Sequence, residues 1–516
     1  MRPGLFRCAG VSLSVAVLIA GCGGSDVVPP PTAQQACASL AGKTIAGATV
    51  LAAAEVAAAG VVPLYCKVSA KIEPALNFEM RIPNAWNGKL YYGGGAGLNG
   101  VIPGLEGPPG AFNLAALKKG YITVNSDSGH QGDPRSGSWA IGNPQAVALY
   151  GHLSVPTVMA SAVPMITAAY GIQPGKSYFE GCSNGGREAL MNAQRYPDLF
   201  DGIIARAPAL DFVGSVGAWN RNQKAFFAPG GQLTHAKTAL LSNAVLASCD
   251  AADGVMDGVV SNPSACTFNP SVLRCTGGGD TGDTCLSDAQ LAVVTSSMTP
   301  AAFAGGAYSN AGWALSGNES APGFWSTNWM NGKTSGQFLL QEAIIKGLIA
   351  GDLSIDSLAY DYDSNPAALH SVAAAIDATN TDLRPFNSSG GKLIMWHGGA
   401  DAAISARNTA RYYQGVTAAV GGQANVDRFA RYYAAPGVNH CGGGPGADST
   451  DLLEALDSWV LNDKAPDQLT ALKLALDGST SFARPLCRHP QYPRYTGPAG
   501  DANAAKLATN YTCTTP

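Results

Sequence analysis

The chain has 516 residues, which is long enough for more than one domain or for one domain with a large insertion. Charged residues make up only 13%, the formal net charge is −4 and no basic block occurs, which argues against nucleic acid as a partner. The abundance of glycine and alanine is more typical of a secreted, loop-rich enzyme than of a long helical assembly.

The N-terminus has the pattern of an export signal. Arg2 and Arg7 precede an apolar run, 11–20, that is too short to span a bilayer stably. The segment 18–22 resembles a bacterial lipoprotein signal, which implies cleavage before Cys22 and a lipid on its sulfur. The alternative is an ordinary signal peptide with an incidental cysteine. We therefore predict an exported protein, either an outer-membrane lipoprotein on the periplasmic or cell-surface side or a secreted one, whose only membrane contact is the lipid anchor.

Two strands, 78–82 and 89–92, begin the mature domain, and the second runs into Gly93-Gly-Gly-Ala-Gly97. A glycine cluster after a strand lets backbone N–H groups approach an oxyanion, which is the role of the first crossover loop in α/β-hydrolases. The alternative for this cluster is a flexible loop. A further strand, 121–125, leads to His130, which we interpret as a structural loop histidine.

The strongest motif lies between a short apolar run and a helical pattern. Residues 176–179 predict a strand, Gly181-Cys-Ser-Asn-Gly185 fits G-x-S-x-G, and 186–196 has helical spacing. Strand, tight turn and helix in this order predict a nucleophile elbow that exposes the Ser183 hydroxyl. The two glycines permit the sharp bend. The alternative is a glycine-rich turn with a solvated serine.

Strands and helices alternate on both sides of this motif. A helix over 146–170, despite two prolines, precedes it, and a strand at 202–205 follows. The alternation resumes with strands at 392–398 and 429–434 and a helix over 451–461. Such alternation implies a parallel sheet covered on both faces.

Over 210–385 this alternation fades. Four cysteines lie close together and aromatic residues gather there, which predicts an inserted lid domain. A lid can donate substrate contacts, but for most of its aromatic residues we favour a place in the lid's own small core. These residues are Trp313, Phe324, Trp325 and Trp329.

A serine hydroxyl becomes a good nucleophile only when a positioned base removes its proton, and a carboxylate must hold the tautomer of that base. In α/β-hydrolases these residues occur in the chain order Ser, Asp, His. Asp401 follows a strand end, and His440 lies in a glycine-rich loop after the next strand. We predict that Ser183, Asp401 and His440 form a catalytic triad. His397, within the strand end before Asp401, is interpreted as structural.

Without Cys8 and Cys22, ten cysteines remain, and an even number predicts disulfides in an exported chain. Cys182 precedes Ser183 and Cys441 follows His440, so a bond between these cysteines would hold the nucleophile next to its base. The alternative is two unrelated structural cysteines. The simplest partner for Cys37 is Cys66, and we expect Cys487 to pair with Cys513.

The predicted lid contains a cluster of aspartates interrupted by glycines. Three carboxylates within about ten residues can wrap a hard cation, and backbone carbonyls can supply further oxygens. Repulsion among the carboxylates favours bound Ca2+ over the alternative, a solvated acidic turn. The spacing differs from that of an EF-hand. The predicted ligands are Asp250, Asp253 and Asp257 with the carbonyls of Val255 and Val259.

Gly181-Cys-Ser-Asn-Gly-Gly-Arg187, Asp401, His440-Cys441 and the aspartate cluster together resemble the tannase and feruloyl esterase family over most of the mature chain. The resemblance implies an α/β-hydrolase with a lid, a Ca2+ site in the lid and hydrolysis of aromatic carboxylic esters. It also implies the disulfides Cys182–Cys441, Cys249–Cys266 and Cys275–Cys285. The predicted organisation is a signal peptide at 1–22, a linker at 23–35, hydrolase core at 36–209, lid at 210–385 and hydrolase core again at 386–516.

We expect His440, oriented by Asp401, to take the proton of Ser183 as its oxygen attacks an ester carbonyl. The backbone N–H groups of Asn184 and Gly95 are the expected oxyanion donors. Water would then cleave the acyl-enzyme with the same base.

One departure from the family limits the substrate. Family members that hydrolyse mono(2-hydroxyethyl) terephthalate place an arginine in the lid to bind the free carboxylate, whereas here no arginine occurs between Arg274 and Arg384. Lys333 is only a weak substitute. We therefore favour neutral phenolic esters (feruloyl, cinnamoyl or galloyl) over the terephthalate half-ester. A lipase or peptidase, and a non-catalytic lipoprotein on a hydrolase scaffold, are the competing functional classes.

Overall fold

The computed structural model of the chain describes residues 31–325 and 332–516. The predicted signal peptide, Cys22 and Trp329 lie outside the described residues. The predicted linker, 23–35, ends too late, because helix α1 (Ala33–Leu40) already begins at Ala33. Thr32 and Gln35 form a capping box at its start, a local signal that the sequence analysis overlooked.

Ten strands form the central sheet, in the order β1-β2-β3-β4-β6-β5-β7-β8-β11-β12. Strands β1 to β4 and the pair β4–β6 are antiparallel, and every pair from β6 to β12 is parallel. All residues of β6 and β8 are buried, as in a sheet covered on both faces. The strands are β1 (Thr44–Ile45), β2 (Ala48–Val56), β3 (Tyr65–Ile72), β4 (Leu76–Pro83), β5 (Lys89–Gly93), β6 (Ile122–Ser126), β7 (Lys176–Cys182), β8 (Gly202–Arg206), β11 (Lys392–Gly398) and β12 (Ala430–Ala435).

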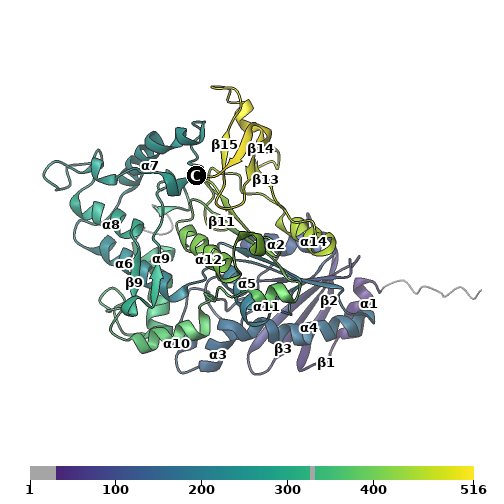
Figure 1. Cartoon of the computed structure of the whole chain (residues 1–516). Coiled ribbons are helices and arrows are strands. Elements are labelled where there is room, and N and C mark those ends of the chain that lie inside the picture. The colour runs from purple at the N-terminus through teal and green to yellow at the C-terminus, as the bar shows by residue number, and fades with distance from the viewer. Residues whose placement is uncertain (1–30, 326–331) are drawn as a thin grey trace, which may run out of the picture.

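Helices cover both faces of this sheet (Figure 1). On one face, apolar residues of α1, α4, α5 and α12 share a core with Val124, Phe179 and Met395 of the strands. On the other face, α2 and α14 pack on Tyr178 and Ile394. The sequence therefore predicted the α/β-hydrolase core correctly. The covering helices are α2 (Gly107–Lys118), α4 (Ser154–Tyr170), α5 (Asn184–Arg195), α12 (Ala406–Ala419) and α14 (Leu452–Asn462).

The predicted helix over 146–170 is continuous but changes its winding. It consists of α3 (Pro144–Ala148), a π-helical turn η2 (Leu149–Leu153) and α4, and it ends at Gly171 in the left-handed conformation. Within the described residues, this one stretch is long and apolar enough to cross a membrane. Because more than half of it is buried and α4 packs on the sheet, it is a core helix of the domain.

The chain between β8 and β11 forms a mainly helical insertion, drawn in teal and green beyond the sheet in Figure 1. Most residues of two apolar clusters come from it, and these clusters contain Trp313 and Trp325. These two aromatic residues thus take the core positions that we favoured, whereas the buried Phe324 lies against the His440 loop, where a Cβ on Gly444 would be 3.1 Å from its ring. The insertion contains α6 (Phe212–Phe227), α7 (His235–Cys249), α8 (Asp288–Met298), the hairpin β9–β10 (Ala301–Phe303, Tyr308–Asn310), α9 (Gly336–Ile344), α10 (Pro366–Ile376) and α11 (Arg384–Ser388).

Two C-terminal hairpins follow the last core helix and were not predicted. They are β13–β14 (Leu469–Leu474, Thr480–Leu486) and β15–β16 (Tyr492–Tyr495, Tyr511–Thr514). Figure 1 shows the chain end next to α7 of the insertion. Cys249 at the end of α7 and Tyr492 in β15 line the same small pocket. The tail therefore lies against the aspartate cluster that follows α7.

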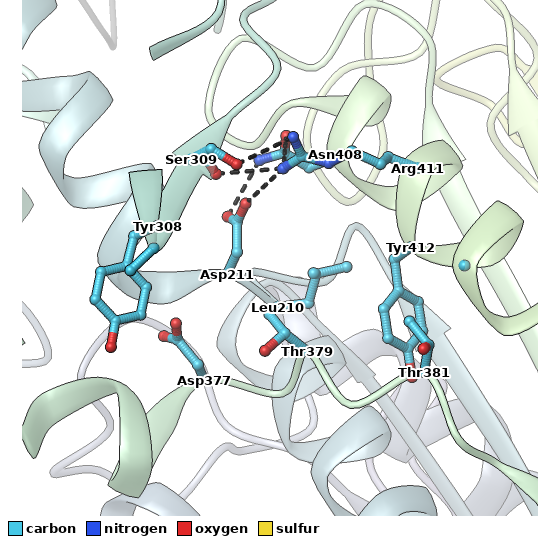
Figure 2. A pocket seen from close by; sticks show the side chains of 12 residues that line it. Leu210, Asp211, Tyr308, Ser309, Asp377, Thr379, Thr381, Asn408, Arg411 and Tyr412 are labelled. Carbon is cyan, nitrogen blue, oxygen red and sulfur yellow. Dashed lines mark hydrogen bonds and ion pairs between the residues drawn. The ribbon is translucent and has the colours of Figure 1, made fainter. Parts of the chain in front are cut away.

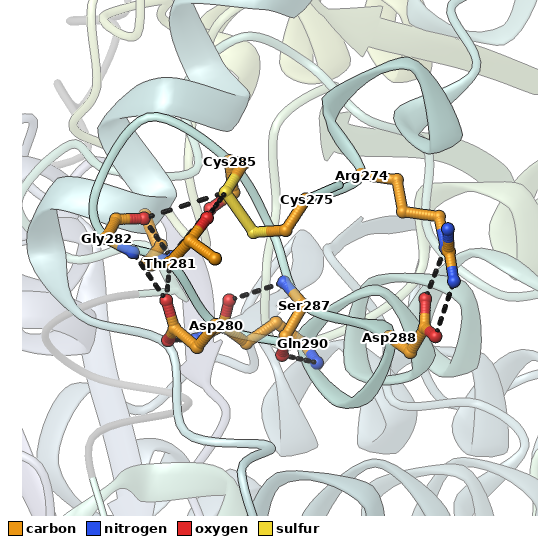
Figure 3. The surroundings of a disulfide bond; sticks show 10 residues. Arg274, Cys275, Asp280, Thr281, Gly282, Cys285, Ser287, Asp288 and Gln290 are labelled. Atoms are coloured by element: carbon orange, nitrogen blue, oxygen red, sulfur yellow. Dashed lines mark hydrogen bonds and ion pairs between the residues drawn. A yellow bond between two sulfur atoms is a disulfide. The ribbon is translucent and has the colours of Figure 1, made fainter. Parts of the chain in front are cut away.

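Five disulfides form among the described residues, and every predicted pairing is confirmed. They are Cys37–Cys66, Cys182–Cys441, Cys249–Cys266, Cys275–Cys285 and Cys487–Cys513. Figure 3 shows the surroundings of Cys275–Cys285 in the insertion, where Arg274 pairs with Asp288. The buried Lys237 ammonium donates to Asp280 and to the carbonyl of Cys285, so this loop is fixed by both covalent and polar contacts.

Candidate active site

Ser183 occupies a sharp turn between β7 and α5. Its backbone has φ 64° and ψ −120°, a conformation that costs a non-glycine residue about 1–3 kcal/mol. A Cβ on Gly181 would lie 2.5 Å from the Gly185 backbone, and a Cβ on Gly185 would lie 2.7 Å from the Gly95 carbonyl. Glycine is therefore required at both positions, and the observed turn has the strand–turn–helix context predicted for a nucleophile elbow.

Asp401 and His440 are hydrogen-bonded, although 39 residues separate them in the chain. His440 Nδ1 lies 2.7 Å from Asp401 Oδ2, and the side chain of His440 is 17% exposed, whereas that of Asp401 is fully buried. Asp401 Oδ1 accepts the amides of Ala403 at 2.7 Å and Ile404 at 3.0 Å. Burial alone would raise the pKa of Asp401, but the neighbouring His440 and His397 overcome this and hold that pKa well below its usual value.

His397, predicted to be structural, is a further hydrogen-bond partner of Asp401. It is fully buried, and its Nε2 lies 3.0 Å from Asp401 Oδ2 and 3.2 Å from the Ile404 carbonyl. Both are acceptors, so Nε2 carries a proton. Nδ1 lies 2.8 Å from the Thr409 hydroxyl. The Asp401 carboxylate thus meets four donors, which fix its orientation.

The disulfide Cys182–Cys441 brings the elbow and the His440 loop together. Its two Cα atoms are 5.9 Å apart across 259 residues of sequence. Because Ser183 follows Cys182 and His440 precedes Cys441, the bond holds the Ser183 turn next to the Asp401–His440 pair. The predicted juxtaposition of these segments is present in the structure.

The glycine loop after β5 packs directly on the elbow. A Cβ on Gly94 would lie 2.8 Å from the Gly185 Cα atom. The Gly94 amide donates to the Glu180 carbonyl, and the Gly95 amide donates to Glu188 Oε2 at 2.9 Å. The N–H of the predicted oxyanion donor Gly95 is therefore already engaged. Among the described residues, no acceptor contacts the amide of Ala96, the next residue of this loop.

Asn184 begins α5, so its backbone N–H has no intrahelical acceptor. This amide is the predicted oxyanion donor on the nucleophile side. The Asn184 side chain turns away into a buried network, where Nδ2 donates to Asn99 Oδ1 at 3.0 Å and Oδ1 accepts Arg187 Nε at 2.6 Å. The helix start and the glycine loop are thus joined by buried polar contacts.

The predicted Ca2+ ligands lie in the turn after α7. Each aspartate accepts backbone amides: Asp250 from Gly258, Asp253 from Val255 and Asp257 from Val259. Asp257 also pairs with Arg484 at 2.6 Å. Within 31–325 and 332–516, no three His, Cys, Asp or Glu side chains converge as a metal site.

One observation in the same turn fits a cation. Asp253 Oδ2 is buried and has no hydrogen-bond partner among the described residues. Burial raises the pKa of Asp253 to about 6, with smaller contributions from the two other carboxylates. A hard cation would satisfy this oxygen, so the Ca2+ site stays a prediction, with Asp253 as its best-supported ligand.

A cavity of about 380 Å³ lies where the insertion meets the core (Figure 2). Asp211 Oδ1 accepts hydrogen bonds from Ser215 and Asn408, and Oδ2 lies 3.4 Å from Arg411. Burial raises the pKa of Asp211 to about 8 and that of Asp377, across the cavity, to about 7. Because Ser183, Asp401 and His440 do not line this cavity, it is separate from the predicted catalytic groups.

Comparison with known proteins places this geometry in a family. The family model for tannase and feruloyl esterase matches residues 58–514. Mono(2-hydroxyethyl) terephthalate hydrolase from Piscinibacter sakaiensis is 33% identical over 88% of this chain and 85% of that protein. A probable feruloyl esterase from Arthroderma benhamiae is 34% identical over 82% of this chain and 80% of that protein.

The solved structure of feruloyl esterase B from Aspergillus oryzae has the same fold. The two structures align with a TM-score of 0.81 over 93% of this chain and 100% of the other, at 23% identity. The chain belongs to the tannase and feruloyl esterase family of carboxylic ester hydrolases.

Proposed function

We propose that the protein is a serine esterase that hydrolyses esters of phenolic aromatic acids through an acyl-enzyme. The observation that carries the proposal is the Asp401–His440 hydrogen bond held against the elbow by the Cys182–Cys441 disulfide. Asp401 stays ionised because four donors surround it. It therefore keeps His440 in the tautomer with Nδ1 protonated and Nε2 able to accept a proton.

In the proposed reaction, His440 Nε2 takes the hydroxyl proton while Ser183 Oγ attacks the ester carbonyl. The tetrahedral oxyanion accepts hydrogen bonds from the Asn184 amide and from the glycine loop. Because the Gly95 amide is engaged by Glu188, we propose the adjacent amide of Ala96, which meets no acceptor among the described residues, as the loop donor. His440 then gives the proton to the leaving alcohol, and a water molecule, activated in the same way, releases the acid.

The charges of the insertion favour a neutral acyl group. Its two arginines before residue 384 are engaged: Arg221 donates to the carbonyls of Thr299 and Pro300, and Arg274 pairs with Asp288. Lys333 lies over the ring of Phe338, with 5.9 Å between the ammonium and the ring centroid. None of these cations offers a planar fork to a free carboxylate. We therefore propose feruloyl, cinnamoyl or galloyl esters as substrates.

The alternative substrate is a terephthalate half-ester. It is supported by the relative from Piscinibacter sakaiensis, which is named for the hydrolysis of mono(2-hydroxyethyl) terephthalate. Parallel assays with methyl ferulate, methyl gallate and this half-ester discriminate between the two substrate classes. A kcat/KM for the half-ester above those for both methyl esters would reject the preference for neutral acyl groups.

The catalytic assignment is tested with Ser183→Ala. The variant should lose turnover of p-nitrophenyl acetate, while its thermal unfolding stays close to that of the unmodified protein. Ser177→Ala, on the same strand but outside the elbow, is a matched control that should keep its activity. Turnover by Ser183→Ala at the wild-type rate would refute the assignment of the nucleophile.

We further propose export with a lipid on Cys22 and Ca2+ binding in the insertion. The sequence pattern of 1–22 and five disulfides support an oxidising destination. Mass spectrometry of the mature N-terminus tests the first proposal, because a processed lipoprotein begins with acylated Cys22. Bound Ca2+ would fix the turn at Asp253 and supply structural stability rather than a step of ester hydrolysis.

A further inference from the structure

Glu188 is a fully buried carboxylate that touches both walls of the proposed oxyanion site. It lies one helical turn after Asn184 on α5, so both side chains point to the same side of the helix. Its side chain contacts the glycine loop across 93 residues of sequence. Only 4% of Glu188 is exposed, which excludes direct contact with a substrate.

Three donors converge on this carboxylate. Oε2 accepts the Gly95 amide at 2.9 Å. Oε1 accepts Asn99 Nδ2 at 2.8 Å and Asn184 Nδ2 at 3.1 Å. Asn99 and Asn184 are also bonded to each other at 3.0 Å. One buried side chain therefore connects the loop that bears Ala96 to the residue that follows the nucleophile.

The charge of Glu188 is compensated locally. Burial raises its pKa, while the adjacent Arg187 and the three donors oppose that effect. Arg187 is fully buried and lies in the same helix turn, so it supplies the nearest positive charge. A buried carboxylate bound in this way is held firmly, because removing any of its donors would leave an uncompensated group in a low-dielectric site.

We propose that Glu188 is a positioning residue that sets the distance between the two oxyanion donors, the amides of Asn184 and Ala96. This inference rests on the proposed serine esterase mechanism. The Gly95 N–H points to Glu188, and the Gly95 carbonyl, which belongs to the same peptide unit as the Ala96 amide, lies against Gly185 of the elbow, since a Cβ there would lie 2.7 Å from this oxygen. The glycines serve the same contact, since a Cβ on Gly94 would lie 3.1 Å from Glu188 Oε2.

The test uses Glu188→Gln in the full mature chain. Glutamine has almost the same shape, but its amide nitrogen would face either the Gly95 N–H or the two asparagine donors, so one contact is lost. Removing one oxyanion donor costs roughly 100-fold or more in kcat, and displacing one should cost roughly 10-fold. We expect kcat to fall by about that factor while KM stays within about two-fold.

A second readout separates positioning from general damage. An aryl boronic acid accepts the Ser183 oxygen on boron while His440 takes the hydroxyl proton, and the boron becomes a tetrahedral anion. The same ring without boron binds without an oxyanion. In Glu188→Gln the inhibition constant of the boronic acid should rise by the factor lost in kcat, and that of the plain ring should not change. Equal weakening of both inhibitors, or an unchanged kcat, would overturn the proposal.

Two further variants complete the experiment. Asn99→Gly removes the hydrogen bond from Asn99 Nδ2 to Glu188 Oε1. The backbone of this residue has φ 49°, which glycine adopts without strain. This variant carries the same test if Glu188→Gln does not fold. Glu319→Gln is the matched control: Glu319 is equally buried and accepts the amides of Ser316 and Gly317, but has no contact with the glycine loop. It should leave the ratio of the two inhibition constants unchanged. Wild-type protein that resists the boronic acid would contradict the proposed mechanism itself.

Discussion

Removing the Cys182–Cys441 bond tests whether this disulfide serves catalysis as well as stability. The bond closes a loop of 259 residues, and the chain-entropy model gives about 5.5 kcal/mol of stabilisation for that length. The same model gives about 3.5 kcal/mol for Cys487–Cys513, which closes 26 residues in the tail. Double alanine variants of the two pairs should therefore differ by about 2 kcal/mol in the free energy of unfolding.

Turnover should separate the two variants more clearly than stability does. Without the bond, the Ser183 turn and the His440 loop are no longer fixed to each other, and a displacement of about 1 Å in reacting groups can cost roughly 100-fold in rate. We expect Cys182→Ala/Cys441→Ala to lose at least roughly 10-fold in kcat and the tail variant to keep its kcat. Urea unfolding followed by tryptophan fluorescence and p-nitrophenyl acetate kinetics below both transitions measure the two effects. If both variants keep the wild-type kcat, the disulfide only stabilises the fold.

Three other predictions concern buried histidines and the aspartate turn. His397→Ala removes one of the four hydrogen-bond donors to Asp401, so kcat for p-nitrophenyl acetate should fall roughly 10-fold at constant KM. An unchanged kcat would exclude a role of His397 in orienting Asp401. Burial lowers the pKa of His130 from 6.5 to about 4, so its contribution to stability is complete above pH 6.5 and is lost as the pH falls towards 4. His130→Phe keeps a ring against Trp139 but cannot take up a proton. In thermal unfolding, this variant should therefore lose less stability between pH 6.5 and pH 4 than the unmodified protein does. Equal losses of stability in the two proteins would contradict the burial argument. Ca2+ at about 100 times its Kd should raise the free energy of unfolding by about 2.7 kcal/mol. Asp253→Asn should abolish this increase. An unfolding temperature that changes with neither Ca2+ nor chelator would reject the site.

The features that the sequence predicted well are those with a local signal. Glycines at 181 and 185 on either side of Ser183 leave few alternatives to a sharp turn, and the flanking strand and helix patterns supply its context. The cysteines next to Ser183 and His440 then provided a long-range distance restraint, which is rare in a single sequence. The strand–turn–helix at Ser183 and the Cys182–Cys441 pairing therefore followed from short stretches of the chain, whereas the pairings Cys249–Cys266 and Cys275–Cys285 followed only from the family resemblance.

The features that were missed depend on side chains meeting across the fold. Nothing near Glu188 in the sequence indicates that its carboxylate meets the Gly95 amide, because the partner lies 93 residues away. His397 was assigned to the strand end correctly, but its ring direction depends on Thr409 and the Ile404 carbonyl. The Gly95 N–H, predicted as an oxyanion donor, instead donates to Glu188, because a glycine-rich stretch does not determine where each N–H points.

Arg187 shows how the insertion is connected to the catalytic turn. Its guanidinium donates to Asn184 Oδ1, to the Gly151 carbonyl at 2.6 Å and to the Ile376 carbonyl at 3.2 Å. Ile376 is the last residue of α10 in the insertion. A single buried arginine therefore binds the end of α10, the π-helical turn and Asn184, the first residue of α5. Because these acceptors come from three elements and only the planar guanidinium fork can reach them together, any shift of α10 changes the contacts that hold the start of α5.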